Sequence, residues 1–461
     1  MAAVTDLEQL GLVEAAEAVR KREISPVELT EHCLARIEET EPYVHAYVTV
    51  DARRAIEEAR AAEAAVLRGA GSGALHGIPL GVKDMFDTAG LRTTYGSPTA
   101  AHHVPSRDAT AVARLRDAGA IVLGKHATHE LAWGGRTDSA YFGPTHNPRR
   151  RGHIPGGSSG GSAASVAVGS SLGSIGTDTA GSVRIPAALS GCVGFKPTRG
   201  RVSLAGVMPL APSLDHVGVL ARTVLDAVAL LDVISGLDTA DPSTRELVAE
   251  REDTDVTALD VAFLSGWPAE IVDPGVASVL DEVREDLSGR GIAVSTATAG
   301  GEAPASAVLT QILAEAGTRH RPAFERRPTS FGPDIAELLR LPPPTPRDLA
   351  RAQATVSRAA AALLELLLEH DVLVLPTVPV TAPRIGESFV DVGDTRAVPI
   401  ELVLTRLTSI FNVAGLPAVS VPAGERDALP VGVQIVGRPG ADHTATAVAA
   451  LIQNTTSVRT S

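Results

Sequence analysis

A stretch of 24 residues without a charged side chain, from Ile154 to Thr177, most narrows what this chain can fold into. Fourteen of these residues are glycine or serine, so the segment is too polar for a membrane helix although it is long enough for one. The simplest interpretation of such a segment is a flexible Gly/Ser linker. However, the small-residue run from Ala163 to Val168 follows the glycines directly and can open a helix. Dense glycine in mid-chain indicates tight turns or close backbone approach, so we expect a packed functional segment here.

The residues on either side of this segment alternate between two patterns. Short apolar runs, Ile78 to Val82 and Ala120 to Leu123, alternate with helical stretches such as Ala109 to Ala118. Alternation of this kind predicts strands and helices packed as an α/β sheet between residues 75 and about 235. The later part of the chain is rich in helical patterns and adds three strand candidates: Val261–Leu264, Val372–Leu375 and Ala418–Val421.

The first seventy residues show helical patterns with few turn signals. Ser25, Pro26 and Glu28 form a capping-box pattern for one helix, and a further helix is expected from Asp51 to Leu67. We expect a single domain over residues 1–461. It comprises an N-terminal helical part (1–72), a core with the functional residues (73–235) and a helix-rich remainder that completes the sheet and pocket (236–461). Two Pro-rich patches, 319–327 and 341–344, are expected to be loops.

Charge and cysteine content exclude several classes of protein. The chain carries 41 basic and 54 acidic residues, a formal net charge of −13, which argues against direct nucleic-acid binding and against an anionic membrane surface. Cys33 and Cys192 are too few for a disulfide framework, and neither lies in a Cys-x-x-Cys metal pair. No secretory signal is visible, so we expect a soluble, cytoplasmic protein without a metal.

Three segments carry residues suited to covalent catalysis. Lys83 ends an apolar run, and burial there would lower its pKa toward neutrality, although a lysine that reaches the surface is the commoner case. Gly181 permits a turn that points successive N–H groups at one place, as an oxyanion requires. The pattern Gly-x-Ser-x-Gly occurs around Ser158 and Ser159, but no strand precedes it, so a nucleophile elbow is not indicated.

Taken together, these segments resemble the amidase signature family. The similarity spans nearly the whole chain, and three motifs occur in the family's order and spacing. The matching motifs are Gly77-Ile78-Pro79-Leu80-Gly81-Val82-Lys83-Asp84, Pro155-Gly156-Gly157-Ser158-Ser159-Gly160-Gly161-Ser162 and Gly176-Thr177-Asp178-Thr179-Ala180-Gly181-Ser182-Val183-Arg184-Ile185-Pro186-Ala187. Supporting segments are Gly191-Cys192-Val193-Gly194-Phe195-Lys196-Pro197-Thr198, Leu214-Asp215-His216-Val217-Gly218 and Asn412-Val413-Ala414-Gly415-Leu416-Pro417-Ala418.

The resemblance implies a fold and a set of roles. The fold is α/β, with a mixed central sheet flanked by helices on both faces. Ser182 would be the nucleophile, Ser158, on a cis peptide after Gly157, the bridging serine, and Lys83 the base. The backbone N–H groups that would stabilise the oxyanion are those of Thr179, Ala180, Gly181 and Ser182. The residues that would brace the site through hydrogen bonds are Ser159, Asp178 and Arg184. Trp133 occupies a position where relatives place part of the acyl-binding wall, and a core tryptophan is the equal alternative.

The implied activity is hydrolysis of a linear carbon–nitrogen bond in an amide, or in a carbamate (urethane) or urea, through an acyl-enzyme and without a cofactor. The expected partner is a small-molecule amide or carbamate, and a homodimer is an open possibility. The rival within the family is the glutaminase (A) subunit of a tRNA-dependent amidotransferase. Such subunits usually have an Arg-Tyr-Gly element in the half after the nucleophile, where this chain has His320-Arg321-Pro322 and Ser330-Phe331-Gly332-Pro333-Asp334. The missing element favours a stand-alone amidase. A catalytically inactive binding protein with the same fold is the alternative of another class.

Overall fold

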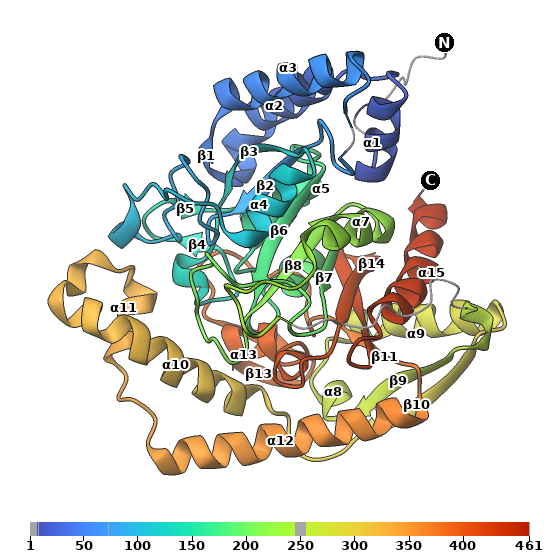
Figure 1. Ribbon diagram of the computed structural model, residues 1–461. Helices are drawn as coiled ribbons and strands as arrows, with labels where there is room; N and C mark the ends of the chain where they lie inside the picture. Colours follow the sequence, from blue (N-terminus) through green and yellow to red (C-terminus); the bar gives the residue numbers. More distant parts are fainter. Residues whose placement is uncertain (1–6, 8, 72, 245–254, 461) are drawn as a thin grey trace.

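An eleven-stranded mixed sheet runs through the molecule and organises all other elements (Figure 1). The computed structural model describes residues 7, 9–71, 73–244 and 255–460. Within them the strand order is β1-β3-β2-β6-β8-β7-β14-β15-β11-β9-β10. The strands of this sheet are β1 (Tyr47–Val50), β2 (Pro79–Lys83), β3 (Ile121–His126), β6 (Gly173–Asp178), β7 (Val193–Lys196), β8 (His216–Ala221), β9 (Asp260–Gly266), β10 (Ala293–Ala299), β11 (Val372–Pro376), β14 (Ala418–Arg426) and β15 (Leu429–Gly437).

The large sheet contains both parallel and antiparallel strand pairs. β2 pairs in parallel with both β3 and β6, and β9 pairs in parallel with β10 and β11. The strands between these groups, from β8 to β15, pair antiparallel. Two small two-stranded sheets lie outside the large one: β4 (Asp138–Ser139) with β5 (Gly143–Pro144), and β12 (Phe389–Val392) with β13 (Thr395–Pro399).

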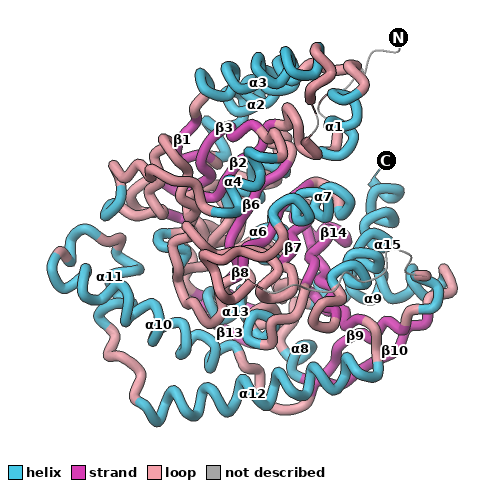
Figure 2. The backbone as a smooth tube through the Cα atoms, viewed as in Figure 1, coloured by secondary structure: helices cyan, strands magenta, loops and turns pink. Residues whose placement is uncertain are grey.

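Helices cover both faces of the sheet, which confirms the expected fold class (Figure 2). Adjacent residues of β8 show the two faces: Leu220 packs with α5 and α6, whereas Val219 belongs to the main core that includes α7 and α15. The helices are α1 (Leu12–Arg20), α2 (Pro26–Val44), α3 (Ala52–Leu67), α4 (Thr110–Asp117), α5 (Gly160–Ala167), α6 (Arg184–Ser190), α7 (Val224–Ile234), α8 (Trp267–Glu270), α9 (Pro274–Gly289), α10 (Ala305–Arg326), α11 (Pro333–Arg340), α12 (Pro346–Glu369), α13 (Ile400–Thr405), α14 (Ile410–Val413) and α15 (Asp442–Thr460).

The local sequence signals place most elements correctly. The Ser25 side chain accepts a hydrogen bond from the Val27 N–H and the Glu28 carboxylate accepts one from the Ser25 N–H, so the predicted capping box forms at the start of α2. All five strand candidates named above coincide with strands of the sheet. The expectation of a loop over 319–327 is wrong, because α10 continues to Arg326 with Pro322 inside it. Its buried residues Gly317, His320 and Phe324 share one face, and packing of that face outweighs the helix hydrogen bond lost at proline.

The glycine-rich segment is packed, as expected, and its later residues form the start of α5. A side chain at Gly161 would place its Cβ 2.4 Å from the carbonyl oxygen of Ala46 and 2.5 Å from the backbone nitrogen of Ala127. Only glycine fits between these two backbones. The segment 156–162 is therefore held closely against the ends of β3 and of the chain before β1.

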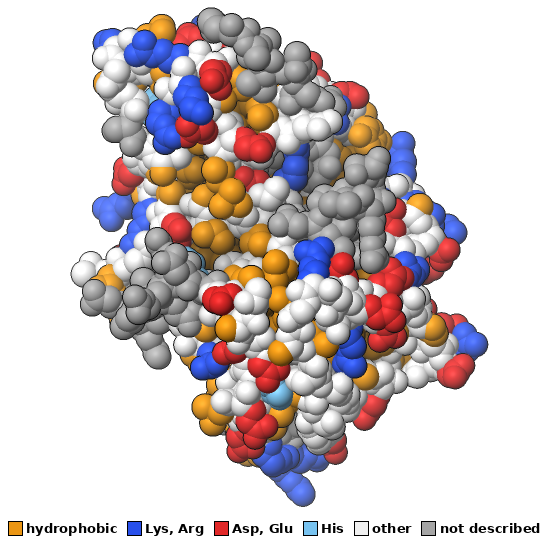
Figure 3. Space-filling view, turned by 90° about the vertical axis from the view of Figure 1, so that its right-hand side faces the viewer, with side chains coloured by type: hydrophobic (Ala, Val, Ile, Leu, Met, Phe, Trp, Pro, Cys, Tyr) orange, Lys and Arg blue, Asp and Glu red, His pale blue; other side chains and the backbone are white. Residues whose placement is uncertain are grey.

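The surface agrees with the composition. Acidic and basic side chains are intermingled over the face shown in Figure 3. Among the described residues, no helix is both long and apolar enough to cross a bilayer.

Candidate active site

Three segments distant in the sequence meet at one edge of the sheet. Lys83 is the last residue of β2, and the neighbouring parallel strand β6 ends at Asp178. Because parallel strands end at the same edge, Lys83 and the loop after β6 lie side by side. The loop that opens α5 completes the group, since the Ser159 N–H donates to the Ser182 carbonyl oxygen at 3.1 Å. The three motifs from the sequence therefore form one site.

Lys83 is fully buried within this site. Its Nζ lies 2.7 Å from Ser158 Oγ, 2.7 Å from Thr177 Oγ1 and 3.4 Å from the Thr177 carbonyl oxygen. Among the described residues, no carboxylate lies within ion-pair distance of it. Burial lowers the pKa of Lys83 well below its usual value, and the charges of Asp178 and Asp215 oppose this only in part.

Three oxygen atoms surround Nζ, and the lowered pKa favours the neutral amine among them. A neutral lysine has two N–H donors and one lone pair. The Thr177 carbonyl can only accept, and Thr177 Oγ1 can take the second N–H. With both N–H groups on the Thr177 oxygens, a neutral amine at this position has its lone pair available for the Ser158 hydroxyl 2.7 Å away. Sequence reasoning assigns Thr177 no role, although it directly precedes Asp178 in the same motif.

Ser158 and Ser182 occupy different positions relative to the cavity. Ser158 is completely buried and follows a cis peptide bond after Gly157. Ser182 is 8% exposed and lines the large cavity described below. Among the described residues, no hydroxyl contact joins Ser158 to Ser182, so the second step of the proton relay stays a prediction. Ser159 supports the loop with its side chain, which donates to the Thr177 carbonyl oxygen at 3.2 Å.

The loop between β6 and α6 is folded around Asp178. Its carboxylate accepts the N–H of Gly181 at 2.8 Å and the N–H of Val183 at 3.1 Å. The N–H of Gly181 thus has an acceptor in Asp178, and the roles of Thr179, Ala180, Gly181 and Ser182 as oxyanion donors stay a prediction. Ala180 and Ser182 line the cavity, and their N–H groups have no acceptor among the described residues. Thr179 also borders the cavity, and its hydroxyl donates to Asp215 at 2.6 Å.

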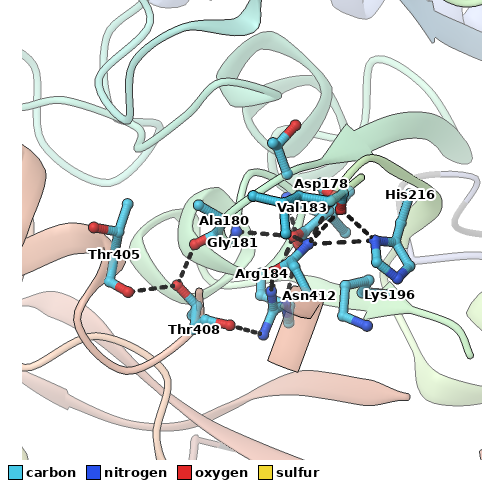
Figure 4. A network of polar contacts seen from close by, with 12 residues as sticks. Asp178, Ala180, Gly181, Val183, Arg184, Lys196, His216, Thr405, Thr408 and Asn412 are labelled. Carbon is cyan, nitrogen blue, oxygen red and sulfur yellow. Dashed lines mark hydrogen bonds and ion pairs between the residues drawn. The ribbon is translucent and has the colours of Figure 1, made fainter. Parts of the chain in front are cut away.

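A buried ion pair fixes Asp178 (Figure 4). Arg184 binds its carboxylate with two nitrogen atoms, at 2.9 and 3.0 Å, and both side chains are fully buried. The Asn412 side chain donates to Asp178 and accepts from Arg184. Burial alone would raise the pKa of Asp178, but Arg184, Lys196 and Asn412 together lower it. The carboxylate is therefore ionised, with the geometry that the loop requires.

Several residues that position this loop are missed by sequence reasoning. Thr408 donates to the Ala180 carbonyl oxygen at 2.6 Å, but it lies outside the motifs and nothing in the sequence around it indicates this contact. Asn412 and Asp215, in contrast, lie inside two of the supporting segments. The motifs of the sequence therefore indicate that Asn412 and Asp215 are important, but they do not predict the role of either side chain.

A cavity of about 590 Å³ opens in front of Ser182. A volume of this size suits a small organic molecule. Trp133 lines the cavity, is 8% exposed and also belongs to the main hydrophobic core, so its position agrees with both interpretations of this residue. The other half of the wall comes from α10, α11 and α13.

One side of the cavity carries a cluster of charged groups. His129 Nε2 lies 2.8 Å from Asp334 Oδ2, and His129 Nδ1 lies 3.4 Å from Asp138 Oδ1. Among the described residues, these three side chains are the one group spaced to hold a metal ion. Arg136 lies 3.5 Å from Asp138 and 3.8 Å from Asp334, and its positive charge opposes a cation there. The cluster is best described as a group of ion pairs. Burial lowers the pKa of His129, but the carboxylates of Asp334, Asp138 and Glu401 raise it by more, so the pKa of His129 is raised overall.

Comparisons with known proteins identify the family of this chain. The sequence profile of the family described as Amidase matches residues 28–445. The chain therefore belongs to the amidase signature family, whose members hydrolyse amide carbon–nitrogen bonds.

Individual relatives cover nearly the full length. The A subunit of glutamyl-tRNA(Gln) amidotransferase from Geotalea daltonii is 36% identical, with 98% of each chain aligned. A solved protein described as revealing the evolutionary origins of an s-triazine catabolic enzyme superposes with a TM-score of 0.89 at 31% identity, covering 97% of this chain and 98% of that one. A structure described as an amidase superposes with a TM-score of 0.85 at 32% identity, covering 96% and 98%.

Proposed function

We propose that this protein hydrolyses linear amide bonds by a Ser182–Ser158–Lys83 mechanism through an acyl-enzyme. The observation that carries the proposal is the 2.7 Å contact between the buried amine of Lys83 and the hydroxyl of Ser158. The Ser158 loop is joined to Ser182, which lines a ligand-sized cavity, by the hydrogen bond from the Ser159 N–H. Catalytic sites characteristically combine a strongly shifted pKa with a concave pocket. Carbamates and ureas present a similar carbonyl and are candidate substrates for the same machinery.

The steps follow from the positions of the groups. Lys83 takes the proton of Ser158 while Ser158 takes that of Ser182, whose oxygen attacks the substrate carbonyl. The free N–H groups of Ala180 and Ser182 stabilise the oxyanion. The proton then returns through Ser158 to the departing amine, leaving an ester on Ser182. Water, deprotonated by the same pair, hydrolyses that ester and releases the carboxylic acid.

Rapid-mixing kinetics with a panel of amides, anilides, carbamates and ureas tests the proposal. We expect at least one class to release its amine in a burst, followed by slower turnover as the ester is hydrolysed, and the burst to disappear in Ser182→Ala. Absence of hydrolysis across the panel by a folded protein would favour the alternative of an inactive binding protein.

The names of the curated relatives favour a second candidate, the glutaminase subunit of a tRNA-dependent amidotransferase. Relatives at 34–38% identity are named as the A subunit of glutamyl-tRNA(Gln) amidotransferase, and these names support this reading better than that of a stand-alone amidase. The candidate would act on glutamine and require partner subunits to hold the tRNA. Arg321, in the segment that replaces the Arg-Tyr-Gly element, donates instead to the carbonyl oxygens of Leu339 and Leu341 at the end of α11. Ammonia release from glutamine, measured beside the amide panel, separates the two candidates.

A further inference from the structure

Five leucines that remain partly exposed line the cavity in front of Ser182. They come from three separate segments around α10, α11 and α13, and all lie outside the three signature motifs. They are Leu309, Leu313, Leu338, Leu341 and Leu402. Leucines usually complete a core, and a group of them gathered around one hollow marks a surface kept apolar for a ligand.

The spacing of these residues supports a single apolar wall. Leu309 and Leu313 are four residues apart and therefore share one face of α10. Leu338 lies near the end of α11 and Leu341 just after it, and Leu402 comes from α13. On the other side of the cavity, Ile185 and Trp133 add buried apolar surface next to Ser182.

The charges of the same cavity disfavour an anionic substrate. Asp334, Glu337 and Glu401 all line it. Among the described residues that line the cavity, Arg136 is the one arginine, and there is no lysine. Arg136 lies 3.3 Å from Glu401 and 3.8 Å from Asp334. His129, whose pKa is raised, also lines the cavity and is paired with Asp334 and Asp138. A substrate carboxylate would therefore meet three like charges, while both basic side chains beside them are already compensated.

We infer that the substrate of this site is an amide with a bulky, uncharged hydrocarbon acyl group, and that the leucine wall selects it. The inference rests on the proposed function and deepens it by naming the substrate class. The acyl side is assigned to the wall because the acyl group stays attached to Ser182 through both half-reactions. Binding it in the leucine wall stabilises both transition states, whereas binding the amine helps only the first.

The experiment compares kcat/KM for a series of 4-nitroanilides from acetyl to decanoyl. Burial of each added methylene is expected to raise kcat/KM by up to about fourfold until the wall is filled. A matched series ending in a carboxylate instead of a methyl group should react at least tenfold more slowly. A value of kcat/KM that is independent of chain length, or fastest with the carboxylated series, would overturn the inference.

Variants of one leucine test the wall directly. Leu313→Trp narrows the cavity at the leucine wall and should lower the decanoyl-to-acetyl ratio of kcat/KM at least tenfold, while Leu313→Ala should shift the optimum to longer chains. The control pair is Leu368→Trp and Leu368→Ala, because Leu368 lies on α12 and is 82% exposed. Unchanged ratios in both Leu313 variants would contradict the inference, even if one of them folded poorly.

Failure of this inference is distinguishable from failure of the proposed function. Hydrolysis of glutamine or other polar amides that depends on Ser182, with no preference for apolar acyl groups, overturns the substrate class alone. If the protein hydrolyses no amide, or if its hydrolysis persists in Ser182→Ala, the substrate class and the proposed function are both overturned.

Discussion

At the scale of single residues, the proposed mechanism depends on Lys83, because a lysine can act as a base only when it is uncharged. Its side chain is fully buried, and its partners are oxygen atoms of Ser158 and Thr177. Burial penalises the ammonium form and lowers the pKa of Lys83. In acid the group is protonated and cannot accept the proton of Ser158. Activity should therefore rise with pH through this lowered pKa and reach its plateau below the ordinary lysine value.

Substituting arginine separates a base from a structural cation. Arginine keeps the positive charge and approximate length but does not release its proton in a protein. We expect Lys83→Arg to lose about a thousandfold or more in kcat, as does Lys83→Ala. Circular dichroism checks that both variants fold. Turnover of the arginine variant within tenfold of the wild type would refute the assignment of Lys83 as base.

The two serines should differ in the severity of their loss. Ser182→Ala removes the attacking atom, so all covalent turnover should stop. Ser158→Ala removes only the bridge between Ser182 and Lys83, and a water molecule in the vacated space can partly replace it. A sensitive fluorogenic amide should detect a trace of activity in Ser158→Ala and none in Ser182→Ala. The reverse order would mean that the roles are exchanged.

At the scale of elements, α11 is attached to the rest of the site by charge. Asp334, in its first turn, contacts His129, and the Gly332 N–H donates to Glu130 at 2.7 Å. Burial would raise the pKa of Asp334, but His129 lowers it to about 2, while His129 itself has a raised pKa. Their attraction is thus present above the pKa of Asp334 and is lost as pH rises through that of His129.

Breaking the contact between Asp334 and His129 should make α11 less firmly held at the cavity without changing the catalytic step. Asp334 is 35% exposed at its side chain, so the pair contributes at most about 1 kcal/mol, which corresponds to up to about fivefold in KM. We expect Asp334→Asn to raise KM for the preferred amide with little change in kcat. Asp391→Asn is the control, because Asp391 pairs with Arg396 on an exposed surface. A fall in kcat without a change in KM would assign Asp334 to the catalytic step instead.

Local signals in the sequence predict elements better than they predict contacts. The capping box at Ser25 and the apolar run before Lys83 indicate α2 and β2, because capping and hydrophobic periodicity act over a few residues. The helix through Pro322 is not predicted, since packing of its buried face decides it. The hydrogen bond of Thr408 to Ala180 joins residues 228 apart, and no local pattern can report such a contact.

At the scale of the whole molecule, the site depends on strands from both halves of the chain. β14 pairs with β7, and Asn412 reaches back to Asp178. The positions of Asp178 and of the loop that follows β6 thus depend on residues of the C-terminal part, 236–461. The division into parts 1–72, 73–235 and 236–461 stays a prediction about the chain, and residues 1–6 and 245–254 lie outside the described residues.

A fragment that ends at residue 236 should therefore not fold by itself. It would expose the edge of β7 and leave Arg184 without Asn412 and the Thr408 carbonyl oxygen. We expect no cooperative thermal transition by circular dichroism and rapid proteolysis, whereas the full chain shows both a transition and resistance. A cooperatively folded fragment would show that the two parts are independent units.

A fluorophosphonate probe forms a covalent adduct with a nucleophilic serine, and mapping that adduct tests the proposed role of Ser182. The probe reacts with an activated serine, which is Ser182 in the proposed mechanism. We predict, by peptide mass spectrometry, one stoichiometric adduct on Ser182, none in Ser182→Ala, and much slower labelling in Lys83→Arg. Labelling of Ser158 or Ser159 in the wild type, or undiminished labelling of Ser182→Ala, would contradict the assignment of Ser182 as the nucleophile.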